Sequence, residues 1–230
     1  MPVRVKVFGD YACFSRPEFK VERVSYPVIT PSAARGVLEA IFWKPEIRYQ
    51  IRQIHVLKLG SQASVLRNEV SEKQSGHPFI AQEKRQQRTS LVLRKISYII
   101  HAEIIFREHV KSDVGKYLDQ FRRRVEKGQC HHMPSLGNRE FAASFEEPLP
   151  AERGDPGINL EIGQMLFDLA FIESRDGKGE LEFIKPGGSG QRKVKGCTAA
   201  LFFPAQVKGG VLDVPREKYA ELYALEQSGA

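Results

Sequence analysis

One stretch decides the fold that the sequence predicts: Tyr98-Ile99-Ile100-His101-Ala102-Glu103-Ile104-Ile105-Phe106. Apolar side chains occupy every second position from Tyr98 to Phe106, and the polar residues His101 and Glu103 fall between them. A period of two is that of a β-strand with one face turned to the core. We therefore expect a central strand here, with His101 on its outer face as an ordinary polar residue.

Regular elements precede this strand along the chain. Apolar and basic residues alternate over 3–8, which predicts a first strand. Thr30 then has the position of a helix cap, with proline next to it and an apolar stripe over 31–41. A second strand is expected over 47–56, where a change of phase near Gln53 indicates a bulge.

Further elements follow the central strand. Asp113 caps a predicted helix that Gly128 ends, and a strand is expected around 140–145. These elements follow the order β-α-β-β-α-β, and one more strand is expected in or beside the polar segment 60–90. This order is that of the ferredoxin-like, or RNA-recognition-like, fold. The fold class is therefore α+β.

Two segments divide the chain. From about residue 60 to residue 91 the sequence is polar and aperiodic, which predicts a long basic insertion without regular structure. Residues 147–159 hold three prolines and two glycines, so we place a domain boundary there. A ferredoxin-like domain would span 1–149, and a small antiparallel β-sheet domain would span 150–230. The second domain is expected to contain three short strands and a last helix, over 165–172, 181–184, 199–203 and 217–226.

The composition excludes several classes of protein. The 230 residues are 41% hydrophobic, which is enough for a large core and excludes a disordered chain. No apolar run approaches the ~20 residues of a membrane span, and the N-terminus has the pattern of a strand rather than a signal peptide, so we expect a cytoplasmic protein. Cys13, Cys130 and Cys197 are odd in number and far apart, unlike a disulfide framework or a structural zinc site. No metal-binding motif occurs, so we expect no metal and no cofactor.

The basic residues are unevenly distributed. Residues 1–150 hold 25 Lys and Arg against 16 Asp and Glu, a net charge of +9, whereas residues 151–230 hold 10 against 12, a net charge of −2. Such an asymmetry indicates a partner with repeating negative charge, either nucleic acid or an anionic membrane surface.

Two groups of cations suggest how such a partner would bind. Arg122, Arg123 and Arg124 surround the polar side of the second helix, although a solvated helix face would look the same. The outer face of the sheet offers basic and aromatic side chains, at Arg4, Lys6, Phe8, Arg48 and Arg52. Basic walls hold phosphates and aromatic rings stack on unpaired bases, so this combination predicts single-stranded RNA as the partner.

Several stretches of the sequence resemble one family. They are Phe8-Gly9-Asp10-Tyr11-Ala12-Cys13-Phe14, Arg16-Pro17-Glu18, Lys20-Val21-Glu22-Arg23-Val24-Ser25-Tyr26, Pro31-Ser32-Ala33-Ala34-Arg35-Gly36, Glu39-Ala40-Ile41-Phe42-Trp43-Lys44-Pro45, Arg67-Asn68-Glu69-Val70, Arg85-Gln86-Gln87-Arg88, Gly115-Lys116-Tyr117 and Leu136-Gly137-Asn138-Arg139-Glu140-Phe141. Together they resemble the subtype I-C (Dvulg) branch of the CRISPR-associated Cas-five family, within the RAMP superfamily. The match covers about the first two-thirds of the chain and is looser afterwards.

The resemblance implies a ferredoxin-like N-terminal domain, a small β-rich C-terminal domain and a place in the Cascade surveillance complex. In this branch the subunit cuts the CRISPR repeat hairpin in precursor RNA and stays on the 5′ handle, next to the backbone and large subunits of type I-C Cascade. Double-stranded DNA is left open as a further partner. The reaction needs no metal, because the 2′-hydroxyl attacks its own phosphate and leaves a 2′,3′-cyclic phosphate and a 5′-hydroxyl. The protein must remove a proton, protonate the leaving oxygen and stabilise negative charge.

Carried over residue by residue, the family's catalytic positions fall on Phe42, Lys116 and Tyr117. The family often has Tyr or His at the first of these positions, just before Trp-Lys-Pro, and Lys-His at the other two. Phe42 cannot hold a proton, so it marks a catalytic position only, and Lys116 is the one match. Because a free tyrosine, with a pKa near 10, is a poor base at neutral pH, His131 or His132 could substitute for it.

The charge pattern and the resemblance together select the cations that we expect to contact RNA: Arg4, Lys6, Lys44, Arg85, Arg88, Arg122, Arg123, Arg124, Lys127 and Arg139. The leading hypothesis is a CRISPR RNA endoribonuclease that remains a Cascade subunit. The main alternative is a non-catalytic subunit that binds the handle while another protein cuts. A third hypothesis is a general RNA-binding module without CRISPR function.

Overall fold

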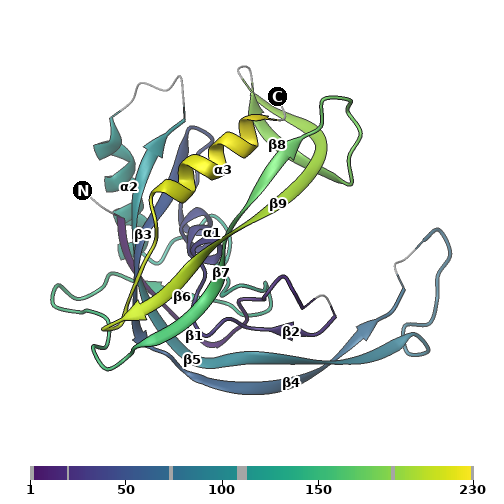
Figure 1. Cartoon of the computed structure of the whole chain (residues 1–230), viewed down its shortest axis with the longest axis horizontal. Helices are drawn as coiled ribbons and strands as arrows, with labels where there is room; N and C mark the ends of the chain where they lie inside the picture. The colour runs from purple at the N-terminus through teal and green to yellow at the C-terminus, as the bar shows by residue number, and fades with distance from the viewer. Residues whose placement is uncertain (1–2, 20, 73–74, 108–112, 188–189, 229–230) are drawn as a thin grey trace.

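A single sheet extends through the chain (Figure 1). The computed structural model describes residues 3–19, 21–72, 75–107, 113–187 and 190–228. Within these residues ten strands form the path β6-β1-β5-β3-β10-β9-β7, with β2 and β4 also paired to β5 and with β8 paired to β9. The elements are β1 (Val3–Ala12), β2 (Arg23–Val24), α1 (Pro31–Ile41), β3 (Ile47–Lys58), β4 (Ser61–Val70), β5 (Arg85–Phe106), α2 (Val114–Glu126), β6 (Ser144–Glu146), β7 (Leu160–Glu173), β8 (Leu181–Gly187), β9 (Gly190–Lys208), β10 (Val211–Asp213) and α3 (Glu217–Ser228).

Strand β5 is the centre of the sheet. Its C-terminal half lies antiparallel between β1 and β3, with Val5 opposite Ile100 and Ile51 opposite Ala102. The side chains of Ile100 and Ala102 are fully buried, which confirms the predicted central strand. The register of β3 shifts between Ile51 and Gln53, so the predicted bulge is confirmed as well.

Helices α1 and α2 begin at the predicted caps. The Thr30 hydroxyl accepts a hydrogen bond from the backbone N–H of Ala33 at 3.2 Å. The Asp113 carboxylate accepts one from the backbone N–H of Gly115 at 2.8 Å. Each cap satisfies a backbone donor that the first helical turn leaves without a partner. Gly128 follows α2 with a φ of +61°, the left-handed conformation that glycine adopts at helix ends.

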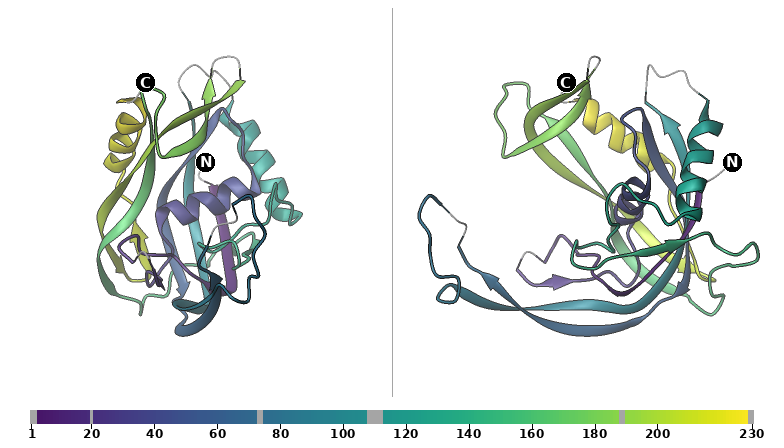
Figure 2. Two further views of the ribbon diagram at one scale, coloured as in Figure 1. Left: turned by 90° about the vertical axis from the view of Figure 1, so that its right-hand side faces the viewer. Right: turned by 180° about the vertical axis from the view of Figure 1, so that it is seen from behind.

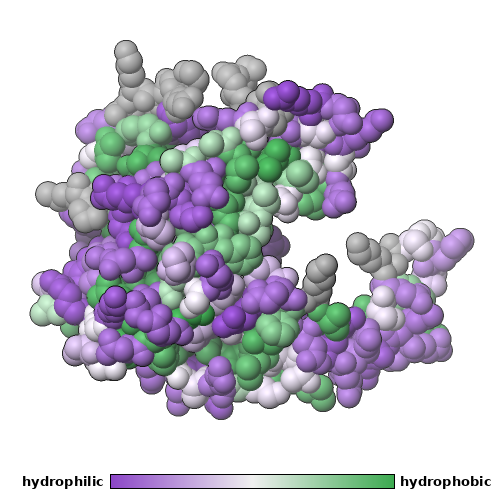
Figure 3. Space-filling view, in the orientation of Figure 1, coloured by the Kyte–Doolittle hydropathy of each residue, from purple (hydrophilic) through white to green (hydrophobic). Residues whose placement is uncertain are grey.

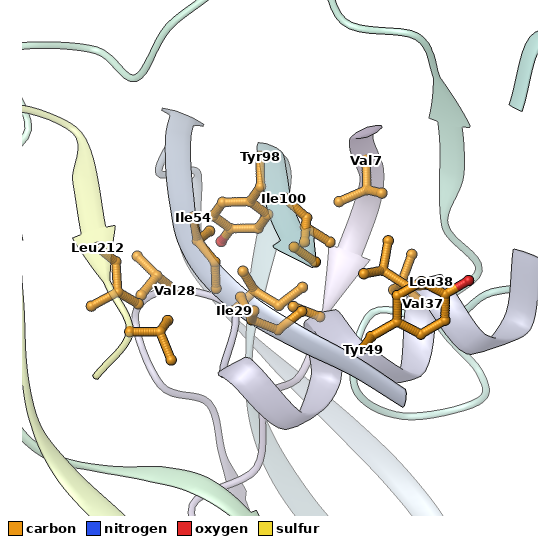
Figure 4. Packing of buried hydrophobic residues seen from close by; sticks show 14 of the residues in the cluster. Val7, Val28, Ile29, Val37, Leu38, Tyr49, Ile54, Tyr98, Ile100 and Leu212 are labelled. Carbon is orange, nitrogen blue, oxygen red and sulfur yellow. The ribbon is translucent and has the colours of Figure 1, made fainter. Parts of the chain in front are cut away.

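The buried faces of both helices and the sheet form one core (Figure 4). Val37 and Leu38 of α1 lie beside Tyr49 of β3 in this view. The ring of Phe121 in α2 lies 6.1 Å from that of Tyr49. Burying each such side chain stabilises the fold by about 1.5–3 kcal/mol. This packing fixes the C-terminal end of α1 and the N-terminal turn of α2 against the sheet.

The polar segment after residue 60 contains the further strand that we expected, β4, but this strand belongs to a long hairpin rather than to an irregular insertion. Strand β4 pairs antiparallel with residues 85–94 of β5 over ten residue pairs. This hairpin, the arm, projects from the rest of the molecule (Figures 1 and 2). Our expectation of irregular structure is therefore wrong. The sequence did not reveal the hairpin because the arm presents much of both faces to solvent and is mainly hydrophilic (Figure 3). Main-chain hydrogen bonds hold its two strands together. Such bonds do not require apolar side chains at every second position, so the sequence shows no strand pattern here.

The C-terminal strands continue the same sheet. Strands β7 and β9 pair antiparallel along most of their length and are longer than the apolar runs that predicted them. Leu212 of β10 lies opposite Val207 of β9 on one side and opposite Ile54 of β3 on the other. The sheet is therefore continuous across the boundary placed at 149/150, and the division into two domains stays a prediction. None of the described helices is long and apolar enough to cross a membrane.

Helix α3 closes the edge of β3 before the point where β10 pairs. The backbone N–H of Ile51 donates to the Tyr219 hydroxyl at 2.6 Å, and this hydroxyl donates back to the Ile51 carbonyl at 3.3 Å. The side-chain amide of Gln50 donates to the Tyr223 hydroxyl at 3.3 Å. The Tyr219 hydroxyl thus takes the place of a neighbouring strand at Ile51.

The outer face of the sheet contains a stacked pair of histidines. The rings of His55 and His101 lie 4.3 Å apart, and one nitrogen of each is buried without a hydrogen-bond partner among the described residues. Burial, with a contribution from Arg4, lowers the pKa of His55, and burial, His55 and Arg4 lower the pKa of His101 to about 4. Both rings are therefore neutral at pH 7. His101 lies on the outer face as predicted, but it is part of this pair rather than an ordinary surface residue.

The histidine pair predicts a loss of stability in mild acid. Below pH 6.5 the unfolded chain protonates these imidazoles and the folded chain does not, so unfolding takes up protons. The free energy of unfolding therefore decreases as the pH is lowered. We expect His101 to account for about 1–2 kcal/mol of the loss between pH 7 and pH 5. Urea unfolding at both pH values should show a smaller loss for His101→Gln than for wild type. The exposed-histidine variant His132→Gln should retain the wild-type loss, and equal losses in all three proteins would contradict the assignment.

Candidate active site

Four chain segments meet beside the sheet: the end of α1, the start of β3, the end of β5 and the first turn of α2. Phe42 follows α1 and is fully buried. The ring of Tyr117, in the first turn of α2, lies 6.3 Å from that of Phe42 and 5.3 Å from that of Phe106. The structure thus brings together two positions that the resemblance selected 75 residues apart. Lys116, between Tyr117 and the capped helix start, is exposed.

A carboxylate that the sequence analysis missed completes this group. The Tyr117 hydroxyl donates a hydrogen bond to Oε1 of Glu46 at 2.9 Å. A phenol bonded to a carboxylate can pass its proton to that carboxylate while it takes another proton from a substrate. Glu46 directly follows Trp43-Lys44-Pro45, so that motif was the available signal, but only the fold shows that it meets Tyr117. The group formed by Glu46, Lys116 and Tyr117 is hereafter called the candidate triad.

Arg124 joins the two helices behind the candidate triad. Its guanidinium donates to the carbonyl oxygen of Ile41 at 2.7 Å and lies 5.4 Å from the centre of the Phe42 ring. This carbonyl is one of the unpaired acceptors at the end of α1, so the cation stabilises that helix end. Arg124 is therefore engaged with the protein, unlike a side chain that extends into solvent.

The two adjacent histidines lie at the same end of α1. The backbone N–H groups of His131 and His132 both donate to the Ala40 carbonyl, at 2.8 and 3.2 Å. Their side chains are exposed, with ring centres 5.8 Å apart. The segment after α2 is thus anchored near the candidate triad, and its imidazoles are accessible to a substrate. Among the described residues, no three His, Cys, Asp or Glu side chains gather as metal ligands.

Two cations of the predicted basic wall on the sheet, Arg4 and Lys6, contact other parts of the protein. Arg4 and Lys6 alternate with buried valines and so point to the sheet face opposite α2. The Arg4 guanidinium donates to the carbonyl oxygen of Glu152 at 2.8 Å. Lys6 forms ion pairs with the Glu146 and Glu152 carboxylates at 3.0 and 2.8 Å. Arg4 and Lys6 are therefore engaged with residues after β6, and their contact with RNA stays a prediction.

The other sheet cations are also paired. Arg52 donates to Glu103, and Arg48 forms an ion pair with Glu226 of α3 at 3.1 Å. In the arm, Arg88 lies 3.2 Å from a Glu69 carboxylate oxygen. Alternation in the sequence predicts which side chains point away from the core, but it does not predict which carboxylates will form ion pairs with them.

The remaining predicted cations are accessible. Five exposed side chains have no ion pair or hydrogen bond among the described residues: Lys44, Arg85, Arg122, Lys127 and Arg139. Arg123 is exposed too, and its side chain donates a hydrogen bond to the Asp119 carbonyl of its own helix at 3.4 Å. The free positive charge near the candidate triad therefore lies on α2 and on the segment after α1. A polyanion can bind there without breaking ion pairs.

Comparisons with known proteins agree in one family. The family model Cas_Cas5d, described as CRISPR-associated protein (Cas_Cas5), matches residues 3–215. A protein of Thermus thermophilus, named CRISPR pre-crRNA endoribonuclease Cas5d, is 55% identical over 99% of this chain and 97% of its own length. One of the same name from Mannheimia succiniciproducens is 38% identical over 93% of this chain and 94% of its own. A solved structure described as a CRISPR-associated protein has a TM-score of 0.62 at 18% identity, covers 95% of this chain and 93% of that one, and shows the shared fold.

Charge reversal on α2 tests whether this helix binds RNA. Arg122 and Lys127 are exposed and unpaired among the described residues, so the double variant R122E/K127E should fold normally. We expect it to weaken binding to many RNAs alike, by at least tenfold, and to reduce the slope of log K against log salt by about 2. The matched control K193E/R216E reverses two exposed cations outside this helix and should change affinity less. Filter binding at several salt concentrations measures both, and equal affinities for wild type and R122E/K127E would remove α2 from the binding surface.

Proposed function

Because this chain belongs to the CRISPR-associated Cas5d family, we propose that it is an endoribonuclease that cuts precursor CRISPR RNA. The hydrogen bond between Tyr117 and Glu46, beside the exposed ammonium of Lys116, is the observation that supports this proposal most directly. It provides a proton acceptor, a proton relay and a cation in one place. The names of the two relatives, which match nearly the whole chain, point to the same activity.

We propose metal-independent cleavage by the neighbouring 2′-hydroxyl. This oxygen forms a bond to phosphorus, and the bond from phosphorus to the 5′ oxygen breaks. Tyr117 takes the 2′ proton while its own proton moves to Glu46, and Lys116 stabilises the negative charge on the pentacoordinate phosphorus. His131 or His132 gives a proton to the leaving 5′ oxygen. The products are a 2′,3′-cyclic phosphate and a 5′-hydroxyl, and side chains of the protein take up and supply both protons.

The proposal extends to the assembly. We propose that the protein keeps the 5′ handle of the product and serves as a subunit of type I-C Cascade, in contact with its backbone and large subunits. The exposed cations of α2 and the residues Lys44 and Arg139 would hold phosphates of the handle. Binding to double-stranded DNA is left to experiment.

We also propose that the N-terminal part is a ferredoxin-like domain. The strand order β6-β1-β5-β3, with α1 between β1 and β3 and α2 between β5 and β6, supports this assignment. In this arrangement the ends of both helices lie close together beside the sheet, where the candidate triad forms. The hairpin arm would then be an insertion between the second and third strands of that domain, and the C-terminal strands would be a separate β-rich unit.

Removing the Lys116 ammonium should slow cleavage without preventing binding. We expect Lys116→Ala to lower the cleavage rate by about 10²–10³, the range for losing one preorganised donor at a transition state. The side chain has no partner among the described residues, so the fold should be unaffected. Single-turnover cleavage of repeat RNA in EDTA measures the rate, with Lys193→Ala as the matched exposed-lysine control. Binding of repeat RNA without cleavage by wild type would support the non-catalytic subunit instead.

The proton relay makes a second prediction about rate. Tyr117→Phe keeps the ring and deletes the hydroxyl, and Glu46→Gln keeps the shape and deletes the charge. We expect each to lower the rate by about 10²–10⁴, and the double variant to cost little more than either alone because the two groups act as a unit. Full activity of Tyr117→Phe would exclude Tyr117 as base or acid. If a histidine is the base instead, the rate should level off above a pH between about 6 and 7.

A further inference from the structure

A cleft of about 750 Å³ opens between α1, the start of β3, the β7–β8 region and α3. Side chains from widely separated parts of the sequence line it, among them Trp43, Arg48, Arg107, Phe171 and Tyr223. Its size is in the range of sites that hold small organic ligands. Neither the candidate triad nor the cations assigned to RNA so far account for this cleft.

One cation in the cleft lacks an anionic partner. Arg107 makes no side-chain hydrogen bond or ion pair among the described residues, and its Nε atom is buried without a partner. Burial and the neighbouring Arg48 lower the pKa of its guanidinium, and the carboxylates of Glu226 and Glu39, which act in the opposite direction, do not offset them. A half-buried cation without an ion pair is stabilised when a ligand supplies the anion.

The neighbouring cations of the cleft, in contrast, have carboxylate partners. Arg35 donates to Asp168 at 2.7 and 2.9 Å and to Glu39 at 2.9 Å. Arg192 donates to both oxygens of Glu173 at 2.7 Å. With Arg48 paired to Glu226 and Lys185 to Glu173, the free positive charge of the cleft is concentrated on Arg107.

Aromatic rings line the same cleft as Arg107. Trp43 is the only tryptophan of the chain, lines the cleft and is 37% exposed. Phe171 is 36% exposed, and its ring lies 5.3 Å from that of Phe183. Large exposed aromatic surfaces cost free energy in water, whereas unpaired bases stack on such rings with a gain of about 1–3 kcal/mol per base. One cation beside aromatic faces is the combination that binds unpaired nucleotides.

We propose that this cleft binds one unpaired nucleotide of the RNA, with its phosphate on Arg107 and its base stacked on Trp43. The inference rests on the proposed function, because it adds a binding subsite to the same reaction. The backbone N–H of Arg107 donates to the carbonyl of Glu46 at 2.9 Å, so the cleft adjoins the candidate triad. Phe106, the residue before Arg107, packs on Tyr117. A nucleotide held in the cleft would therefore lie next to the one that is cut.

An acidic peptide fits the cleft less well. The carboxylates of Glu39, Asp168 and Glu226 line the same walls and would repel further acidic side chains. A single phosphate on Arg107 meets its charge without placing a second anion near them. The aromatic rings, moreover, match the flat faces of a base.

Fluorescence of the single tryptophan tests the proposal directly. The probe is 2′-O-methyl oligouridine of eight nucleotides, which cannot be cut through a 2′-hydroxyl. Its titration should quench Trp43 in wild type, because a stacked base contacts the indole. Arg107→Gln should bind about 5–10-fold more weakly at 0.1 M salt, with the slope of log K against log salt reduced by about 1 and the quench at saturation kept. The matched control Arg216→Gln removes an exposed arginine elsewhere and should behave as wild type.

Three results would overturn the cleft assignment. The first is that Trp43 fluorescence is not quenched although the anisotropy of labelled oligonucleotide shows saturation. The second is that poly-L-glutamate quenches Trp43 equally. The third is that Arg107→Gln and Arg216→Gln bind the oligonucleotide with equal affinity. Wild-type cleavage of repeat RNA is measured in parallel. If wild type cuts repeat RNA while the cleft results fail, the proposed function stands and only the subsite falls. If the oligonucleotide quenches Trp43 but repeat RNA is never cut, the subsite stands and the cleavage proposal falls.

Discussion

The hydrogen bonds that β5 makes on both sides hold the molecule together. Its C-terminal half pairs with β1 and β3, and its N-terminal half pairs with β4 in the arm. Because the register is fixed, Ile100 and Ala102 face the core together with Val5 and Ile51. A shift by one residue would turn these side chains to the opposite face. The helices pack on the face that this register creates, and the candidate triad lies where their ends meet.

The same contacts that build the site determine which cations stay free. Arg124 is used to hold the end of α1, and the His131 backbone is bonded to the Ala40 carbonyl. Arg4 and Lys6 fix the segment after β6 on the outer face of the sheet. These interactions are local and partly buried, so they are less sensitive to salt than contacts with a polyanion. Positive charge that remains unpaired near the candidate triad is thus available for a partner.

Much of the architecture could be predicted because it depends on neighbours in the sequence. The alternation from Tyr98 to Phe106 and the caps at Thr30 and Asp113 are local patterns, and the structure confirms them. The arm lacked such a pattern, since its strands are defined by hydrogen bonds to each other rather than by burial. The contact of Tyr117 with Glu46 joins residues 71 positions apart, and no spacing rule predicts it. The acidic partners of the sheet cations are also distant in sequence. Counting charges along the chain therefore overestimated the free positive charge on the outer face of the sheet.

The tyrosine that closes the edge of β3, Tyr219, has a consequence for the order of events during synthesis. Ile51 leaves the ribosome long before its partner Tyr219. The next part of the β3 edge also waits for a late partner, since Gln53 lies opposite Asp213 of β10. A nascent chain that has made the central strands therefore still has an open strand edge with unsatisfied N–H and C=O groups. Such edges pair readily with other chains. Closure of this edge thus waits until β10 and α3 have been made, and a shorter chain that lacks them would keep an edge open to pairing with other chains.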